Sequence, residues 1–363
     1  MAAVVAGLAA CSVSAPDPEP PARVAATGGP ESGTPSTTAP TEPAPTATPP
    51  RPAWGPTRAD IRRARQAVHN MTLAERAGQV IVAGYSGTAA PTALVDDYHL
   101  GGVIVMGDNV ASVEAVRRSN RRLQRTHEQP WPLFIGVDQE GGVVNRLGAP
   151  MTRFPTFMSY GAARRPDLTR AAARASGREL RAAGFTAVFA PDADVTLGPA
   201  DPTIGSRSAG SRPGLVARTV TDAVDGYAAS GILPVVKHFP GHGGLTSDSH
   251  VGLPVQPASP GALGRRDLRP FRAAVDAGVP AVMVGHIDVR AIDPGIPATV
   301  SRRVVSGLLR SRVGFSGLVV TDAMEMGAVV QRFRPGVAAV RALRAGADVV
   351  LMPPDVEAAH AAI

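Results

Sequence analysis

The sequence predicts an α/β domain of the (β/α)8 type, a TIM barrel, and three observations support this prediction. Short runs of apolar, mostly β-branched residues recur along residues 59–363, and amphipathic segments rich in Ala and Arg separate them. There are eight of these runs, the number of parallel strands that closes such a barrel. Charged or imidazole side chains lie within a few residues after the end of five of the runs, where barrel strands present their active-site residues.

The expected elements alternate in the order that a barrel requires. The expected strands are residues 79–83, 102–106, 133–137, 187–190, 233–236, 281–284, 317–320 and 348–352. The expected helices include residues 111–126, 167–183, 214–230, 267–277, 301–312 and 336–345. Apolar strands that alternate with helices indicate a parallel sheet covered by helices. A doubly wound open sheet is the alternative, but the first strand is not followed by the G-x-G-x-x-G turn.

The start of the chain has the character of an export signal. Residues 1–11 form a short apolar run that ends in LAA and Cys11, which resembles a signal peptide with a lipobox cysteine. Such a run is too short to span a bilayer. We therefore expect a secreted protein, anchored by a lipid on Cys11 to the outer face of the bacterial cell membrane. A chance cysteine in an apolar leader is the alternative. No Lys or Arg precedes the run, so the true start could lie upstream of Met1.

The rest of the chain divides into a linker and a domain. Residues 12–58 are rich in Pro, Thr, Ser, Ala and Glu and have no hydrophobic period, which predicts a disordered linker. Residues 59–363 have enough apolar content for a single core, so we expect one domain there. After the last expected strand only about ten residues remain. A barrel needs a complete helix at this point, and we expect the last helix to be truncated.

The positive charge of the chain comes almost entirely from arginine. The formal net charge is +7, and Lys237 is the only lysine among 37 basic residues. The arginines are scattered over the expected helices, and no basic run is interleaved with aromatic residues, so we expect no nucleic-acid partner. A lysine that persists in this composition indicates a site that needs a compact ammonium group instead of a planar guanidinium.

The segment KHFPGHG at residues 237–243, followed by Asp248 and His250, carries the densest group of reactive side chains. An aspartate that is hydrogen-bonded to a histidine orients the imidazole and raises its pKa into the range of a general acid or base. Asp322 follows the seventh expected strand after Thr321 and can supply a nucleophilic carboxylate. These residues predict a hydrolytic site on the barrel rim.

Two other functional classes remain open on the same residues. One is a metal-dependent hydrolase with His238, His242, Asp248 and His250 as ligands. The other is a non-catalytic wall-binding lipoprotein that keeps the pocket without turnover. His242 is expected to brace its glycine-rich loop, and His286 is expected either to line the site or to cap the sixth strand.

Four stretches resemble motifs of glycoside hydrolase family 3, specifically its bacterial β-N-acetylglucosaminidase (NagZ-like) branch. KHFPGHG…DSH at residues 237–250 resembles the signature of that branch, and DQEGGVVNR at residues 138–146 resembles its substrate-binding motif. IGSRS at residues 204–208 resembles the arginine loop, and TDAMEM at residues 321–326 resembles the nucleophile motif. The stretches occur in the family's order over nearly all of residues 60–363.

The resemblance implies a retaining exo-β-N-acetylglucosaminidase that acts on cell-wall-derived or chitin-like saccharides without a metal or other cofactor. Asp322 would be the nucleophile, and His250, tuned by Asp248, would be the acid/base. The residues implied to bind the sugar are Asp138, Arg146, Arg207, Lys237 and His238. We expect a monomer. A β-glucosidase and a GlcNAc phosphorylase are the alternatives within the family, since an imidazole acid/base does not repel an incoming phosphate.

Overall fold

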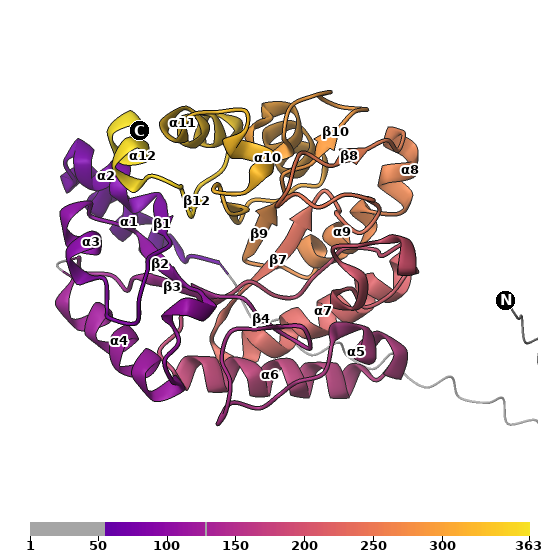
Figure 1. Ribbon diagram of the computed structural model, residues 1–363, viewed down its shortest axis with the longest axis horizontal. Coiled ribbons are helices and arrows are strands. Elements are labelled where there is room, and N and C mark those ends of the chain that lie inside the picture. The colour runs from indigo at the N-terminus through magenta and orange to yellow at the C-terminus, as the bar shows by residue number, and fades with distance from the viewer. Residues whose placement is uncertain (1–54, 128) are drawn as a thin grey trace, which may run out of the picture. The chain divides into compact units, whose positions relative to one another are not determined.

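Eight short parallel strands close into a barrel in the computed structural model, which describes residues 55–127 and 129–363 (Figure 1). The barrel strands are β1 (Ile81–Ala83), β2 (Gly102–Val105), β3 (Phe134–Val137), β6 (Ala187–Val188), β7 (Leu233–Phe239), β9 (Ala281–Val284), β11 (Leu318–Thr321) and β12 (Val350–Leu351). Each strand overlaps one of the eight runs expected from the sequence, so the (β/α)8 fold is confirmed. The expected signal peptide with Cys11, and nearly all of the expected linker, lie outside the described residues.

The strands follow one another around the barrel in chain order. Parallel pairing joins β12, β1, β2 and β3 in one half and β6, β7, β9 and β11 in the other. A backbone hydrogen bond of 3.0 Å from Phe189 N to Val137 O joins β3 to β6. A parallel bridge between Val320 and Val349 joins β11 to β12. All carboxyl ends of the strands therefore lie on one rim, where a barrel carries its active site.

Side chains along the barrel strands alternate between two apolar layers. In β1, Val82 belongs to a cluster inside the barrel, and its neighbours Ile81 and Ala83 belong to the larger core between the barrel and the helices. This alternation follows from the two-residue period of a strand. The inner cluster also includes Ile104, Phe189, Val235, Ala281, Met283, Val320 and Leu351. The barrel is thus filled by side chains and leaves room for a ligand only at its rim.

Helices surround the barrel (Figure 1). The outer helices are α2 (Leu73–Gln79), α3 (Thr92–Asp97), α4 (Val113–Thr126), α6 (Pro166–Ala182), α7 (Pro213–Ser230), α9 (Leu268–Asp276), η5 (Arg303–Arg312), α11 (Pro335–Ala345) and α12 (Val356–Ala362). Shorter helices in the connections are η1 (Gly107–Asn109), α5 (Phe157–Ala163), η2 (Gly198–Ala200), η3 (Gly205–Arg207), α8 (Pro260–Arg265), η4 (Ala298–Val300) and α10 (Gly327–Val330). All six helices expected from the sequence are present, and η5 is a π-helix.

Two small pairs of strands lie outside the barrel. Strand β4 (Gln139–Gly141) pairs with β5 (Val144–Asn145) in antiparallel fashion, directly after β3. Strand β8 (Val255–Gln256) pairs in parallel with β10 (Asp288–Val289). The first pair carries the DQEGGVVNR motif, so it places that motif at the carboxyl end of β3.

The N-terminal helix α1 (Arg58–Asn70) is not expected from the sequence analysis, and it begins within the expected linker. The Thr57 hydroxyl accepts a hydrogen bond from Asp60 N, and the Asp60 carboxylate accepts one from Thr57 N. Thr72 and Glu75 form the same reciprocal cap at the start of α2. The signal was present in the sequence, because a Thr followed three residues later by an acidic residue marks a helix start. The linker as expected therefore extends one residue too far.

The final helix α12 follows β12 and packs against α2, near the start of the barrel domain. His360 Nε2 lies 2.9 Å from Ala74 O, and the His360 ring makes an edge-to-face contact with Tyr98. These contacts tie the last described helix to α2 and α3. None of the helices within residues 55–127 and 129–363 combines the length and the apolar character that crossing a bilayer requires.

Candidate active site

A cavity of about 270 Å³ lies at the carboxyl rim of the barrel. It is lined by seven of the eight residues that the sequence analysis placed in catalysis or sugar binding. These are Asp138, Arg146, Arg207, Lys237, His238, His250 and Asp322. The eighth, Asp248, contacts His250 from behind the cavity wall. Residues that are up to 184 positions apart in the chain thus meet because β3, β7 and β11 all end on one rim.

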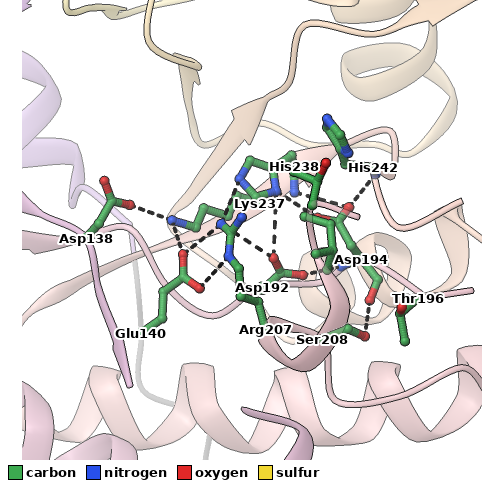
Figure 2. A network of polar contacts seen from close by, with 12 residues as sticks. Asp138, Glu140, Asp192, Asp194, Thr196, Arg207, Ser208, Lys237, His238 and His242 are labelled. Carbon is green, nitrogen blue, oxygen red and sulfur yellow. Dashed lines mark hydrogen bonds and ion pairs between the residues drawn. The ribbon is translucent and has the colours of Figure 1, made fainter. Parts of the chain in front are cut away.

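The single lysine is held in a buried ion-pair network (Figure 2). Lys237 Nζ lies 2.5 Å from Asp138 Oδ1 and 2.6 Å from Glu140 Oε1. Arg207 donates from Nε and Nη2 to the two oxygens of Glu140, at 2.9 Å each. Burial alone would raise the pKa of Glu140, but the charges of Lys237 and Arg207 lower it to about 2. Glu140 is therefore ionised and fixes the two cations at the cavity wall.

Glu140 is a site residue whose role the sequence left ambiguous. Its side chain is only 4% exposed and it lines the cavity beside Arg207. The signal in the sequence was weak, because a charge before two glycines serves equally well to brace a turn. The bidentate geometry with Arg207 becomes visible only when β4 and η3 are brought together.

His238 is oriented by a fully buried aspartate. Its Nδ1 lies 2.7 Å from Asp194 Oδ2, while its Nε2 lies 3.4 Å from Arg207 Nη2 (Figure 2). An arginine nitrogen only donates, so we assign the proton of the ring to Nδ1, which donates to Asp194. Asp194 Oδ1 also accepts a 2.5 Å hydrogen bond from His242 N. Burial by itself would raise the pKa of Asp194, but His238 and these hydrogen bonds lower it.

Asp192 lies beside this pair and has a different environment. Its Oδ1 accepts a 2.8 Å hydrogen bond from Asp194 N, whereas its Oδ2 is buried and has no hydrogen-bond partner among the described residues. Burial and the neighbouring Asp194 raise the pKa of Asp192 well above its usual value. The two carboxyl groups thus differ in their contacts, since Asp194 Oδ2 pairs with His238 Nδ1 at 2.7 Å, whereas Asp192 Oδ2 lies 3.9 Å from Arg207 Nη2 and 3.8 Å from His238 Nδ1.

The metal cluster considered from the sequence does not assemble. In the described part of the chain, the only group of three or more potential ligands is Asp192, Asp194 and His238. His242 instead pairs through Nε2 with Ser249 Oγ at 3.1 Å, which is the loop-bracing role expected for it. His250 Nδ1 pairs with Asp248. Of the four residues named for metal-dependent hydrolysis, only His238 belongs to that group, so the four do not form one ligand cluster within the described residues.

Asp322 lies between the end of β11 and α10. Its Oδ1 accepts a 2.8 Å hydrogen bond from Ala323 N, and its backbone N–H donates to Val284 O at 2.9 Å. Burial alone would raise the pKa of this carboxyl, but His238, His286 and the hydrogen bond from Ala323 lower it. Asp322 is therefore ionised and partly screened from water, as a carboxylate nucleophile must be.

Asp248 and His250 lie on the long loop that follows β7. Asp248 Oδ1 accepts a hydrogen bond of 2.9 Å from the backbone N–H of His250. The same oxygen lies 2.7 Å from Nδ1 of the His250 ring. Partial burial would raise the pKa of Asp248, but these hydrogen bonds lower it. The aspartate thus holds Nδ1 and leaves Nε2 of His250 free to serve as an acid/base.

The loop that carries this pair rests on the start of α10. Gly327 N donates to His250 O at 3.1 Å, and Ala328 N donates to Ser249 O at 3.2 Å. A Cβ on Gly327 would lie 2.6 Å from His250 O, so only glycine permits this approach. Helix α10 begins five residues after Asp322, and the docking therefore couples the position of the loop that carries Asp248 and His250 to that of Asp322.

One wall of the cavity is apolar and was not found from the sequence. It is formed by Ile104, Met106, Met283, Leu351 and Met352. These side chains extend from β2, β9 and β12, or directly follow them. A methionine in or beside an apolar strand gives no sign of whether it faces a core or a ligand, so no local pattern could have singled them out.

Comparison of the sequence with known proteins identifies the family. Residues 72–363 match the glycosyl hydrolase family 3 N-terminal domain. The chain is 36% identical over 290 residues to the β-hexosaminidase LpqI of Mycobacterium tuberculosis, covering 76% of this chain and 72% of LpqI. The chain belongs to glycosyl hydrolase family 3. The resemblance of its four motifs to that family is thereby confirmed.

Two further relatives are also named for hexosamine-cleaving activities. β-Hexosaminidase A of Pseudoalteromonas piscicida is 35% identical over 279 residues, which cover 72% of this chain and 47% of that protein. The solved structure of a family 3 β-N-acetylglucosaminidase from Paenibacillus sp. is 40% identical, with a TM-score of 0.78 over 80% of this chain and 57% of that one. The chain thus groups with the β-hexosaminidases of family 3, although it spans only about half the length of these two relatives.

Proposed function

We propose that this family 3 protein is a retaining exo-β-N-acetylglucosaminidase that releases terminal β-linked GlcNAc through a covalent glycosyl-enzyme intermediate. The observation that carries the proposal is the shared cavity of Asp322 and His250, with Asp248 bound to the far side of the His250 ring. An ionised carboxylate and an imidazole on separate elements of one cavity are the two groups that the retaining mechanism needs. The relatives named for β-hexosaminidase activity support the sugar.

In the first step Asp322 attacks the anomeric carbon. Its carboxylate oxygen forms a bond to that carbon while the bond to the aglycone oxygen breaks. The Nε2–H of the protonated His250 gives its proton to the leaving oxygen, and Asp248 stabilises the imidazolium before the transfer. In the second step neutral His250 takes a proton from water, which attacks the anomeric carbon and releases Asp322.

The buried network would bind the sugar hydroxyls. Asp138 accepts hydrogen bonds, whereas Lys237 and Arg207 donate them, and the ion pairs with Glu140 hold these cations in place before substrate arrives. Because the cations are already positioned, little side-chain entropy is lost on binding. Arg146 lines the same cavity, and no ion pair or hydrogen bond of its guanidinium is found within the described residues. It would donate to the substrate.

Trapping of the intermediate tests the nucleophile. A 5-fluorinated GlcNAc fluoride should form a stable adduct, and mass spectrometry of the digested protein should find it on the peptide that contains Asp322. An adduct on another carboxylate would contradict the assignment. Complete absence of an adduct, together with turnover that a chelator abolishes, would favour the metal-dependent alternative.

A panel of aryl glycosides tests the sugar and the acceptor. Release of nitrophenol from the β-GlcNAc substrate is expected to exceed release from the β-glucoside, and the reverse order would indicate a β-glucosidase. Turnover in phosphate compared with turnover in an inert buffer of equal pH and ionic strength separates hydrolysis from phosphorolysis. Formation of GlcNAc 1-phosphate would identify a phosphorylase, which a neutral imidazole tolerates because it carries no negative charge.

The natural substrate and the location are part of the same proposal. Cell-wall-derived or chitin-like saccharides supply terminal GlcNAc outside the cell, and a lipid on Cys11 would keep the secreted enzyme at the outer face of the membrane. The lipobox-like residues around Cys11 support the anchor. Labelled fatty acid should enter the wild-type protein but not the Cys11→Ser variant, and equal labelling would contradict the anchor.

A further inference from the structure

A buried chain of hydrogen bonds lies behind Asp322 and does not belong to the cavity lining. It consists of His286, which follows β9, and Thr299, which lies in η4; both residues are 0% exposed. His286 Nδ1 lies 2.5 Å from Thr299 Oγ1, and His286 Nε2 lies 2.9 Å from Ala323 O. The chain therefore connects η4 to the residue that follows Asp322. Neither alternative expected for His286, lining the site or capping its strand, describes this arrangement.

The partners determine the direction of each hydrogen bond. A carbonyl oxygen only accepts, so the Nε2–H of His286 donates to Ala323 O. Burial lowers the pKa of His286, which keeps the ring neutral and leaves Nδ1 as an acceptor. The hydroxyl of Thr299 must then donate to Nδ1, in preference to the 3.1 Å contact that it makes with Gly285 O. The hydroxyl thus selects the ring tautomer that can hold Ala323.

Ala323 is the link between this chain and the carboxylate. Its N–H donates to Asp322 Oδ1 at 2.8 Å, and its carbonyl accepts from both His286 Nε2 and Met326 N, the latter at 3.1 Å. Asp322 Oδ1 is therefore fixed by a residue whose own carbonyl is fixed. With one carboxylate oxygen held, rotation of the side chain is restricted while Asp322 lines the cavity. A carboxylate that rotated freely would reach the attack geometry only part of the time.

We propose that His286 and Thr299 are positioning residues for the nucleophile, which orient Asp322 through Ala323 without touching the substrate. The inference rests on the proposal that Asp322 is the nucleophile. It assigns a task to a buried histidine that the binding network does not use. The effect should lie in the chemical step, because neither side chain lines the cavity where the sugar binds.

Substitution of Thr299 tests the inference with little change in volume. Thr299→Val removes the hydroxyl, whereas Thr299→Ser retains it. We expect Thr299→Val to slow inactivation by 5-fluoro-GlcNAc fluoride by about tenfold at saturation, the loss that corresponds to one buried hydrogen bond, with the inhibitor's dissociation constant unchanged. Thr299→Ser should stay close to the wild type. Thr219→Val is the matched control, since Thr219 is 5% exposed in α7 and donates to Leu215 O at 3.0 Å.

Substitution of His286 gives the second measurement. The Nε2 of a glutamine can occupy the place of the imidazole Nε2 and donate to Ala323 O, so His286→Gln should retain more of the inactivation rate than His286→Leu. Wild-type inactivation in Thr299→Val, an equal loss in Thr299→Ser or Thr219→Val, or a change confined to the dissociation constant would each overturn the inference. If instead the wild type forms its adduct on another residue, the proposed function fails and the positioning of Asp322 falls with it.

Discussion

The two halves of the proposed active site differ in how they are held. The sugar-binding half is buried at the strand ends, where Lys237 is 2% exposed and Glu140 is 4% exposed. The acid/base half lies on a loop, where the side chain of Asp248 is 38% exposed and that of His250 is 66% exposed. Groups that bind the same hydroxyls throughout the reaction gain from rigidity. His250 would first face the aglycone oxygen and then a water molecule, so it needs access to both.

Because the two halves differ in burial, substitutions in them should affect different quantities. A change within the network alters the free energy of unfolding together with binding, because it leaves a charge without its partner in a dry environment. A change on the loop alters the rate with little effect on folding, because water solvates whatever remains. The five predictions below test this separation, beginning with Asp322, the residue that both halves serve.

The largest effect is expected from Asp322→Ala. Removal of the carboxylate eliminates the bond-forming group, and kcat for aryl GlcNAc hydrolysis should fall by at least about 10⁴-fold. The sugar-binding half remains intact, so binding of GlcNAc measured by calorimetry should persist. Loss of both binding and turnover would show that Asp322 also holds the network together, and the division into two halves would fail.

His250→Ala should reduce kcat/KM for substrates with poor leaving groups by about 10² to 10⁴-fold, the usual contribution of a general acid. A dinitrophenyl leaving group departs without a proton, so the variant should lose much less kcat/KM on a dinitrophenyl substrate. The unfolding temperature should hardly change, because the side chain is mostly exposed. Equal losses for both leaving groups would assign His250 to a role other than proton transfer.

Glu140→Gln should destabilise the protein by about 3–5 kcal/mol, since it leaves Lys237 and Arg207 buried with one carboxylate fewer. Chemical denaturation measures this loss, and the unfolding free energy of an Asp167→Asn variant is measured for comparison. Asp167 is paired with Arg165 at the surface, so its substitution should change the unfolding free energy far less. Similar losses in the two variants would mean that burial does not govern the strength of these pairs.

The same glutamate predicts a dependence on pH. Its pKa is lowered from 4.5 to about 2 in the folded protein, so its contribution to stability is complete above the ordinary value and is lost as the pH falls toward 2. The difference in unfolding free energy between wild type and Glu140→Gln should therefore shrink between about pH 4.5 and 2. A difference that stays constant over this range would show that Glu140 is not ionised in the folded state.

Gly327→Ala should have the smallest effect, a loss of about tenfold in kcat. The added methyl group meets His250 O and lifts the loop from α10, which moves the acid/base pair without touching the network. Gly307→Ala in η5 is the matched control, because the nearest atom to its Cβ is Arg302 O at 3.8 Å. The loss in kcat should again be largest for substrates with poor leaving groups. An equal loss in Gly307→Ala would show that the contact between Gly327 and the loop is not its cause.

The local and periodic features of this protein were determined by its sequence. The continuous apolar runs of the strands predict the barrel, because a closed parallel sheet buries both faces of every strand. The motifs at residues 138–146 and 321–326 predict which side chains stand at the rim, because the rim is wherever those strands end. The Asp248–His250 pair is also local, since only one residue separates its members along the chain.

Contacts between distant segments were decided only by the tertiary structure. The bidentate pair of Glu140 with Arg207, and the pair of His238 with Asp194, join residues that are 67 and 44 positions apart. Neither spacing has a period or motif that distinguishes it from any other. The chain from Thr299 through His286 to Ala323 is hidden in the same way, because a neutral buried histidine leaves no mark on composition or charge. Which partner a polar side chain finds depends on barrel closure, and closure is a property of all eight strands together.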